Sequence, residues 1–174
     1  MIFDGYWKKE LKYHIKQIRL WQYLSANHSQ YAEHQINKYV LYSAIVIRKM
    51  IEEEKDAEKQ LKASTLKMPA LYLLNYRIPV LKFKFSGDDS FILHRIITDY
   101  YKDKAVKDAL EAEYVANNII HSYIWGLGYS DVRDKRRITH FMVSSDRYKS
   151  KYLYGISLDD WIAYVEYCIN RSTI

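Results

Sequence analysis

Asn117 and His121 are the residues whose types and spacing best suit chemistry, because they lie four positions apart. Residues at this spacing share one face of a helix. A histidine can act as a general acid or base, since its usual pKa of about 6.5 is near neutrality. An asparagine one turn away can orient the imidazole or hold a phosphate oxygen. The same pair also suits a buried contact that hydrogen-bonds to a neighbouring helix, and both interpretations stay open.

The basic segment 129–151 is the second group of candidate residues. Its seven basic residues and three aspartates leave a local excess of four positive charges, and aromatic residues interleave with them. Basic groups contact phosphates and aromatic rings stack on unpaired bases, as in proteins that hold single strands. The alternative is a solvated hairpin whose lysines discourage edge-to-edge strand pairing. The predicted nucleic-acid-binding residues are Arg133, Lys135, Arg136, Arg137, Arg147, Lys149 and Lys151.

Several common chemistries lack their sequence motifs in this chain. It contains no phosphate-binding loop, dinucleotide fingerprint or nucleophile elbow. His28 and His34 have no cysteine or carboxylate at ligand spacing. The single cysteine, Cys168, has no partner for an intrachain disulfide, and the last helix is expected to bury it. We therefore expect no metal and no cofactor.

Residues 114–121 resemble the active-site helix of the HEPN superfamily. That helix carries an arginine, a polar residue that is often asparagine, three further residues and a histidine. Asn117 and His121 match the polar residue and the histidine, whereas Ala116 stands at the arginine position. The resemblance implies an all-helical protein whose arginine and histidine cleave RNA at a dimer interface without a metal.

The alanine at position 116 changes what this resemblance implies. Alanine cannot supply the cation that stabilises the transition state of RNA cleavage. A degenerate member that binds RNA or protein, rather than cutting RNA, is therefore the implied function. An active enzyme would need another cation in the same place, for which Arg133, Arg136 and Arg137 are the hypothetical candidates.

Hydrophobic periodicity predicts the helices and strands that position these residues. Apolar residues at spacings of three and four predict helices over 6–25, 30–62, 91–101 and 104–125. The helix over 104–125 carries Asn117 and His121 on its inner stripe and ends at Gly126, a suitable C-cap residue.

A different, alternating pattern predicts the strands. Apolar residues alternate with lysines at 81–85, which predicts one short strand, and residues 138–145 and 152–158 predict a β-hairpin. Ser157 and Asp160 resemble a capping box for a final helix over 159–170.

The expected fold class is mainly α within the α+β class: a helical bundle with a small C-terminal β-hairpin followed by a final helix. The 174 residues fit a single domain over 1–174, with a helical core at about 6–125 and the hairpin and terminal helix at about 138–170. No apolar run suits a signal peptide or a membrane span, so a cytoplasmic location and no membrane partner are expected.

The formal net charge of +6 is a weak indication of an acidic partner. We expect a small soluble helical binding protein that meets a nucleic acid, RNA above all, or a protein through a basic, tyrosine-rich face. The alternatives are a HEPN-like ribonuclease or toxin that uses His121 and a non-catalytic interaction protein in host defence or phage biology, so whether the chain is an enzyme stays open. Self-association as a homodimer is also expected, through Tyr39, Tyr42, Tyr114 and Tyr123.

Overall fold

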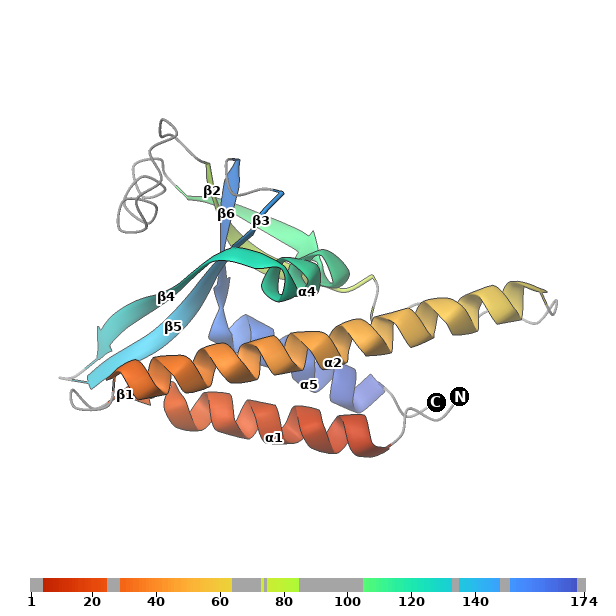
Figure 1. The fold of residues 1–174 in the computed structure, drawn as a ribbon, viewed down its shortest axis with the longest axis horizontal. Coiled ribbons are helices and arrows are strands. Elements are labelled where there is room, and N and C mark those ends of the chain that lie inside the picture. The colour runs from red at the N-terminus through yellow and green to blue at the C-terminus, as the bar shows by residue number, and fades with distance from the viewer. Residues whose placement is uncertain are drawn as a thin grey trace.

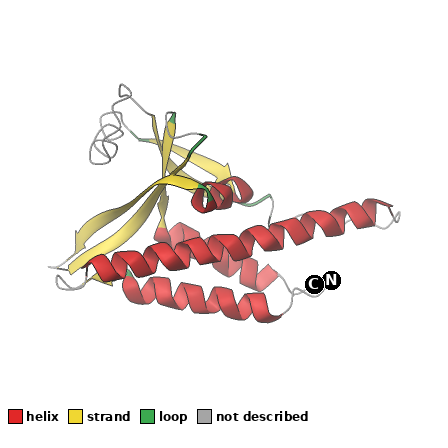
Figure 2. Ribbon diagram, viewed as in Figure 1, coloured by secondary structure: helices red, strands yellow, loops and turns green. Residues whose placement is uncertain are grey.

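The computed structural model describes four α-helices and six β-strands (Figure 1, Figure 2). The residues described are 5–24, 29–63, 73, 75–84, 105–132, 135–147 and 151–171. The helices are α1 (Gly5–Trp21), α2 (Ser29–Ala63), α4 (Ala112–Ile120) and α5 (Leu158–Arg171). The strands are β1 (Tyr23–Leu24), β2 (Arg77–Lys84), β3 (Val106–Glu111), β4 (Ser122–Val132), β5 (Lys135–Ser145) and β6 (Tyr152–Ser157).

The strands form one antiparallel sheet in the order β1-β5-β6-β2-β3, and β4 pairs with β5 as well. Strand β5 is the organising strand, because β4 follows its whole length while β1 and β6 pair with successive parts of it. The long helices α1 and α2 run side by side beneath the sheet, and α4 lies between α2 and the sheet (Figure 1). None of the described helices is both long and apolar enough to cross a membrane.

The six-stranded sheet makes the predicted fold class wrong. A helical bundle with one small C-terminal hairpin was expected, but the β5–β6 hairpin is only part of a larger antiparallel sheet. The sheet also differs from the all-helical architecture that the HEPN resemblance implies.

The helix expected over 104–125 is the main source of this error. Its first part is strand β3, its middle is the nine-residue helix α4, and its end belongs to strand β4. Helix-favouring residues form β3 because pairing with β2 satisfies their backbone groups, so tertiary pairing outweighs local propensity. Gly126 does not end a helix but lies within β4.

Gly128 shows why glycines in this region belong to a strand. Gly128 pairs with His140 of β5, and a Cβ added at Gly128 would lie 3.3 Å from the Cβ of His140. A side chain here would require His140 to shift by a few tenths of an ångström, so the glycine permits a close approach of the two strands and does not break the element.

The other predicted elements within the described residues are confirmed. Helices α1 and α2, strand β2, the β5–β6 hairpin and helix α5 form where periodicity predicts them. The bounds differ in two places: α1 ends at Trp21 and Tyr23–Leu24 form β1, and β2 begins at Arg77. The Ser157 Oγ caps α5 by accepting hydrogen bonds from the backbone N–H groups of Asp159 and Asp160, at 3.2 and 3.4 Å. The helix expected over 91–101 lies outside the described residues.

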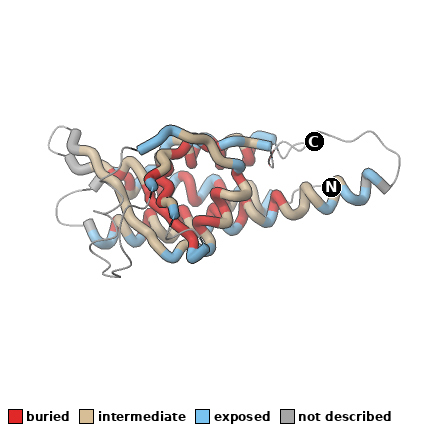
Figure 3. Tube along the Cα trace, turned by 90° about the horizontal axis from the view of Figure 1, so that it is seen from above, coloured by how far each residue is buried: buried red, intermediate tan, exposed pale blue. Residues whose placement is uncertain are grey.

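One hydrophobic core joins the helices to one face of the sheet (Figure 3). Trp161 of α5 lies at its centre with Phe141 of β5 and Tyr164, and all three are fully buried. Met142, between Phe141 and Val143, points to the opposite face and joins a smaller cluster with Phe83 and Leu153. This alternation is the period of two that a strand imposes on its side chains.

We expect the buried His14 of α1 to make the stability of the protein depend on pH. The ring lies among those of Tyr13, Tyr39 and Tyr42, and its Nδ1 has no hydrogen-bond partner among the described residues. Burial lowers the pKa of His14, although the carboxylate of Glu10 acts in the opposite direction. Below about pH 6.5 the unfolded chain therefore binds a proton that the folded protein excludes. The free energy of unfolding should fall with decreasing pH there, by at most about 1.4 kcal/mol per pH unit.

Urea denaturation at a series of pH values between about 5 and 8 measures this dependence. His14→Gln should flatten the slope below about pH 6.5, whereas His34→Gln, at an exposed position of α2, should leave it unchanged. Burial also lowers the pKa of His140, so a smaller slope should persist in the His14 variant. An unaltered slope in His14→Gln would contradict the prediction.

Candidate functional site

Asn117 and His121 lie where α4 ends and the chain enters β4. His121 is the C-cap residue, and its backbone N–H donates to the carbonyl oxygen of Asn117 at 3.0 Å. The His121 side chain is exposed and that of Asn117 is partly buried. The imidazole is therefore open to solvent and is not sealed between helices.

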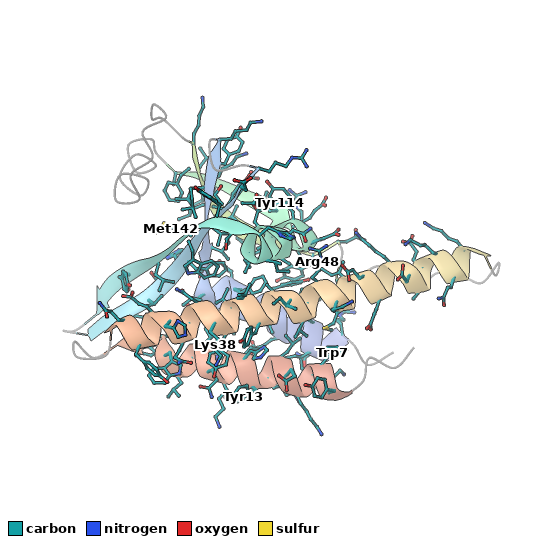
Figure 4. All side chains as sticks on the ribbon, viewed as in Figure 1. Trp7, Tyr13, Lys38, Arg48, Tyr114 and Met142 are labelled. Atoms are coloured by element: carbon teal, nitrogen blue, oxygen red, sulfur yellow. The ribbon has the colours of Figure 1, made fainter. Side chains whose placement is uncertain are left out.

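Arg48 of α2 contacts His121 across the space between the two helices. Its Nη1 lies 3.2 Å from His121 Nε2, and its Nε donates to Glu52 Oε1 at 3.1 Å. Figure 4 shows the Arg48 side chain between α2 and α4, near Tyr114. A guanidinium group only donates hydrogen bonds, so His121 Nε2 is the acceptor in this contact.

A cleft of about 500 Å³ opens beside this contact. Residues from α2, α4, the end of β5 and the turn after it line the cleft, which we call the Arg48 cleft. The lining residues are Arg48, Tyr114, Asn117, Asn118, His121, Ser145, Asp146 and Arg147. Its size is typical of pockets for small ligands or for one unit of a larger chain.

Strand pairing brings the turn of the hairpin to the cleft. Ser122, the first residue of β4, pairs with Ser145, the last residue of β5. The turn after β5 therefore begins beside the junction of α4 and β4, and Arg147 in that turn lines the same cleft as His121. Two groups of residues that are far apart in the sequence meet here.

Asn117 and Asn118 place two buried amide oxygens at the cleft. Asn118 is 4% exposed, and its Nδ2 donates to the Tyr114 carbonyl oxygen at 2.8 Å, which fixes the orientation of the amide. The Oδ1 atoms of both asparagines are buried and accept no hydrogen bond from any described residue. An unpaired buried acceptor costs free energy, because burial removes the hydrogen bonds that water would otherwise donate to it.

The charges around the cleft are mixed. Two guanidinium groups, of Arg48 and Arg147, are balanced in part by the carboxylates of Asp146 and Glu52. The carbonyl end of α4 adds a negative partial charge near His121. This combination suits a ligand that has both hydrogen-bond acceptors and donors, rather than a simple anion.

Of the other predicted binding residues, Arg137 and Lys151 have described side chains, and neither lines the cleft with Arg147. Arg137 lies at the opposite end of β5, roughly 25 Å away at the rise per residue of a strand. It forms an ion pair with Asp159 at 3.0 Å and its guanidinium lies 5.2 Å from the ring centroid of Tyr23. Lys151 is exposed and directly precedes β6, the second strand of the hairpin.

The structure does not describe the side chains of four further predicted binding residues. Lys135 and Arg136 belong to β5 by their backbone pairing, but the structure does not describe their side chains. Arg133 and Lys149 lie outside the described residues. Among the basic residues with described side chains, Arg147 and Lys151 therefore lie at the turn end of the β5–β6 hairpin, whereas Arg137 lies near the other end of β5.

Sequence reasoning missed Arg48 and Asn118 as members of the site. Arg48 is 73 positions from His121, and its place on a solvated helix face carries no local signal. Asn118 directly follows Asn117, so a helical period places it on another face. The adjacency of Asn117 and Asn118 was the only feature of the sequence that pointed to Asn118.

The four tyrosines expected to support self-association do not share one surface role. Tyr39 is buried and its hydroxyl lies 3.3 Å from that of Tyr13, while the Tyr114 hydroxyl lies 3.2 Å from that of Tyr154. Tyr42 and Tyr123 are exposed. A homodimer stays a prediction.

Comparison with known proteins does not identify a relative of this chain. No family model matches it, and no curated protein or solved structure gave a match. Within the described ranges, no group of three or more histidine, cysteine or acidic side chains could hold a metal ion. The function is therefore inferred from the residues of the cleft.

Proposed function

We propose that the protein binds single-stranded nucleic acid, with a backbone phosphate held in the Arg48 cleft. The observation that carries this proposal is the meeting of Arg48, Arg147 and His121 in one open cleft. Arginine suits phosphate oxygens because its planar fork offers parallel donors, and a neutral imidazole can donate from Nδ1.

A single strand fits the mixed character of the cleft better than a duplex does. Its sugar and bases offer donors and acceptors that a duplex backbone alone does not present. Tyr123 is half exposed on β4, two residues after His121, where a base can stack on its ring. Because the nearby carboxylates and the carbonyl end of α4 oppose an anion, the affinity depends on the two arginines.

Single-charge variants test this proposal by fluorescence anisotropy with a labelled single-stranded RNA of about twelve nucleotides. Arg48→Ala and Arg147→Ala should each weaken binding about ten- to a hundredfold, because a hydrogen bond to a charged group contributes about 1.5–3 kcal/mol. Each should also reduce the dependence of log K on log salt concentration by about 0.7.

Arg19→Ala is the matched control, since it also removes one exposed arginine, from α1, where Arg19 pairs with Glu166 at 2.8 Å. It should change the affinity less than about twofold. Equal losses in all three variants would mean that overall charge, and not the cleft, attracts the nucleic acid. Absence of binding by the unmodified protein at low salt would reject the proposal.

RNA cleavage is a second candidate function, favoured by the contact between Arg48 and His121. Arg48 supplies a cation beside the histidine, where the HEPN-like helix has Ala116 in place of arginine. The same RNA, incubated with the protein and a chelator and then separated on a gel, distinguishes the two functions. Cleavage that His121→Ala abolishes supports catalysis, whereas intact RNA bound by the protein leaves binding alone.

A further inference from the structure

We infer that a single strand held in the Arg48 cleft continues along the exposed side of α2, where one of its bases stacks on the ring of Tyr42 and a phosphate contacts Lys38. This inference rests on the proposed binding of single-stranded nucleic acid. It adds a stacking residue and a further phosphate contact to that site, and it gives the strand a path across the protein.

The exposed residues of α2 between positions 31 and 49 lie on one stripe of the helix. Together with the partly buried Lys38 they recur at spacings of three or four, which places them on a single face. We call them the α2 stripe: Tyr31, His34, Lys38, Tyr42, Ile45 and Lys49. Its two tyrosines and its isoleucine are exposed by 57%, 43% and 44%. The outward stripe of a helix that meets only water is polar, so this composition indicates a binding surface.

The α2 stripe also carries positive charge and no carboxylate. Lys38 and Lys49 lie on it, and Arg48 lies beside it. The one acidic residue between positions 31 and 49 is Glu33, which accepts a hydrogen bond from the hydroxyl group of Tyr129 in β4. Beyond position 52 the helix instead carries carboxylates and lysines that pair with one another. The stripe therefore suits a polyanion.

Lys38 and Tyr42 are the pair on this stripe that best suits a nucleotide. The Lys38 Nζ lies 5.8 Å from the ring centroid of Tyr42 and 5.3 Å from that of Tyr39. Tyr39 is buried, so the contact with its ring keeps the ammonium group beside the exposed ring of Tyr42. A cation next to an exposed ring offers a phosphate contact and a stacking surface at neighbouring positions, as in proteins that bind single strands.

The stripe is continuous with the Arg48 cleft. Arg48, Ile45, Tyr42 and Lys38 follow one another at spacings of three, three and four, so each lies against the next on the helix surface. Along the helix axis Tyr42 is about 9 Å from Arg48, and Lys38 is about 15 Å from it, at 1.5 Å per residue. Figure 4 shows Arg48 and Lys38 on this helix. The nucleotides next to the one in the cleft can therefore reach Tyr42 and Lys38.

A nucleic acid fits the stripe better than a second copy of this chain or an acidic peptide does. In a symmetric dimer the same patch meets itself, so the lysines of the stripe would face one another with no carboxylate between them. An acidic peptide supplies negative charge but no flat ring for Tyr42. A single strand supplies phosphates and unpaired bases together.

Two labelled strands of about twelve nucleotides separate base stacking from phosphate contact. One is single-stranded RNA, and the other is an abasic RNA strand that has the same number of phosphates but no bases. In fluorescence anisotropy, Tyr42→Ala should weaken RNA binding about five- to a hundredfold and change the affinity for the abasic strand less than about twofold. Tyr42→Phe keeps the ring and should bind RNA as the unmodified protein does.

Lys38→Ala should weaken the binding of both strands, and it should reduce the dependence of log K on log salt concentration by about 0.7. Tyr23→Ala is the matched control for the loss of an exposed ring. Tyr23 is 58% exposed in β1, which pairs with the end of β5 that is remote from the cleft. This variant should keep the affinity for RNA within about twofold.

The outcomes separate this inference from the proposed function. Loss of RNA binding in Arg48→Ala, with no loss in Tyr42→Ala or with an equal loss on both strands, would overturn stacking on Tyr42 and leave the cleft in place. A dimer in sedimentation that Tyr42→Ala converts to a monomer would also overturn it, because a second copy would then cover the ring. Polyglutamate that binds as tightly as RNA and is weakened equally by Tyr42→Ala would assign the stripe to an acidic protein. No binding of RNA by the unmodified protein would overturn both proposals.

Discussion

Trp161→Ala should lower the free energy of unfolding by about 3–5 kcal/mol. The indole of Trp161 is fully buried, with ring centroids 6.0 Å from Phe141 and 5.9 Å from Tyr164. Its Nε1 donates to Ser43 Oγ of α2 at 3.0 Å, so it links α5 to α2 as well as to the sheet. Alanine would leave a large cavity where these three elements meet.

Guanidinium denaturation followed by far-ultraviolet circular dichroism measures the loss. Trp161→Phe keeps a ring and removes the donor to Ser43, so it should cost clearly less than the alanine variant. Tyr6→Ala, which truncates an aromatic side chain that is 56% exposed, should change stability by less than about 0.5 kcal/mol. A loss below about 1.5 kcal/mol in Trp161→Ala would contradict the central position of this residue.

Cys168 should react with a thiol reagent at least about a thousand times more slowly in the folded protein than in the unfolded chain. Burial raises the pKa of the Cys168 thiol from 9.0 to about 12. At pH 8 this shift reduces the reactive thiolate from about a tenth of the molecules to about one in ten thousand. The full burial of the side chain slows the reagent further.

Absorbance after addition of an aromatic disulfide reagent at pH 8 measures both rates, with and without denaturant. The chain has one cysteine, so the signal reports Cys168 alone. Below the raised pKa, the native rate should increase about tenfold per pH unit. A native rate close to the unfolded one would show that the end of α5 opens readily, contrary to the packed core around Cys168.

The elements that the sequence predicted correctly have strong local patterns. In α1, Leu11, Ile15 and Ile18 recur at helical spacing and are buried. In α5, Trp161, Val165 and Cys168 do the same, and Ser157 supplies the cap. Each of these patterns depends only on residues within one or two helical turns, so the helices can be predicted without knowing the rest of the fold.

The region between residues 104 and 125 has conflicting local signals. Its lysine, aspartate, alanine, leucine and glutamate residues favour a helix, and only the presence of β2 alongside makes β3 a strand. The role of Gly128 is equally hard to predict from local sequence, because it depends on His140 of the neighbouring strand. Strand pairing is a long-range interaction that no short window of sequence contains.

The candidate site also has one part that local sequence predicts and another part that depends on the tertiary structure. Local spacing was enough to single out Asn117 and His121 and to place them within one turn, because helical geometry is set by neighbouring residues. Only the tertiary structure decided that Arg48 and Arg147 complete the site and that Arg137 does not. Arg48 contacts His121 because α2 packs against α4. Arg147 lines the same cleft because β4 pairs with β5. Contacts between such distant residues depend on how helices and strands assemble, which residue types and spacing do not specify.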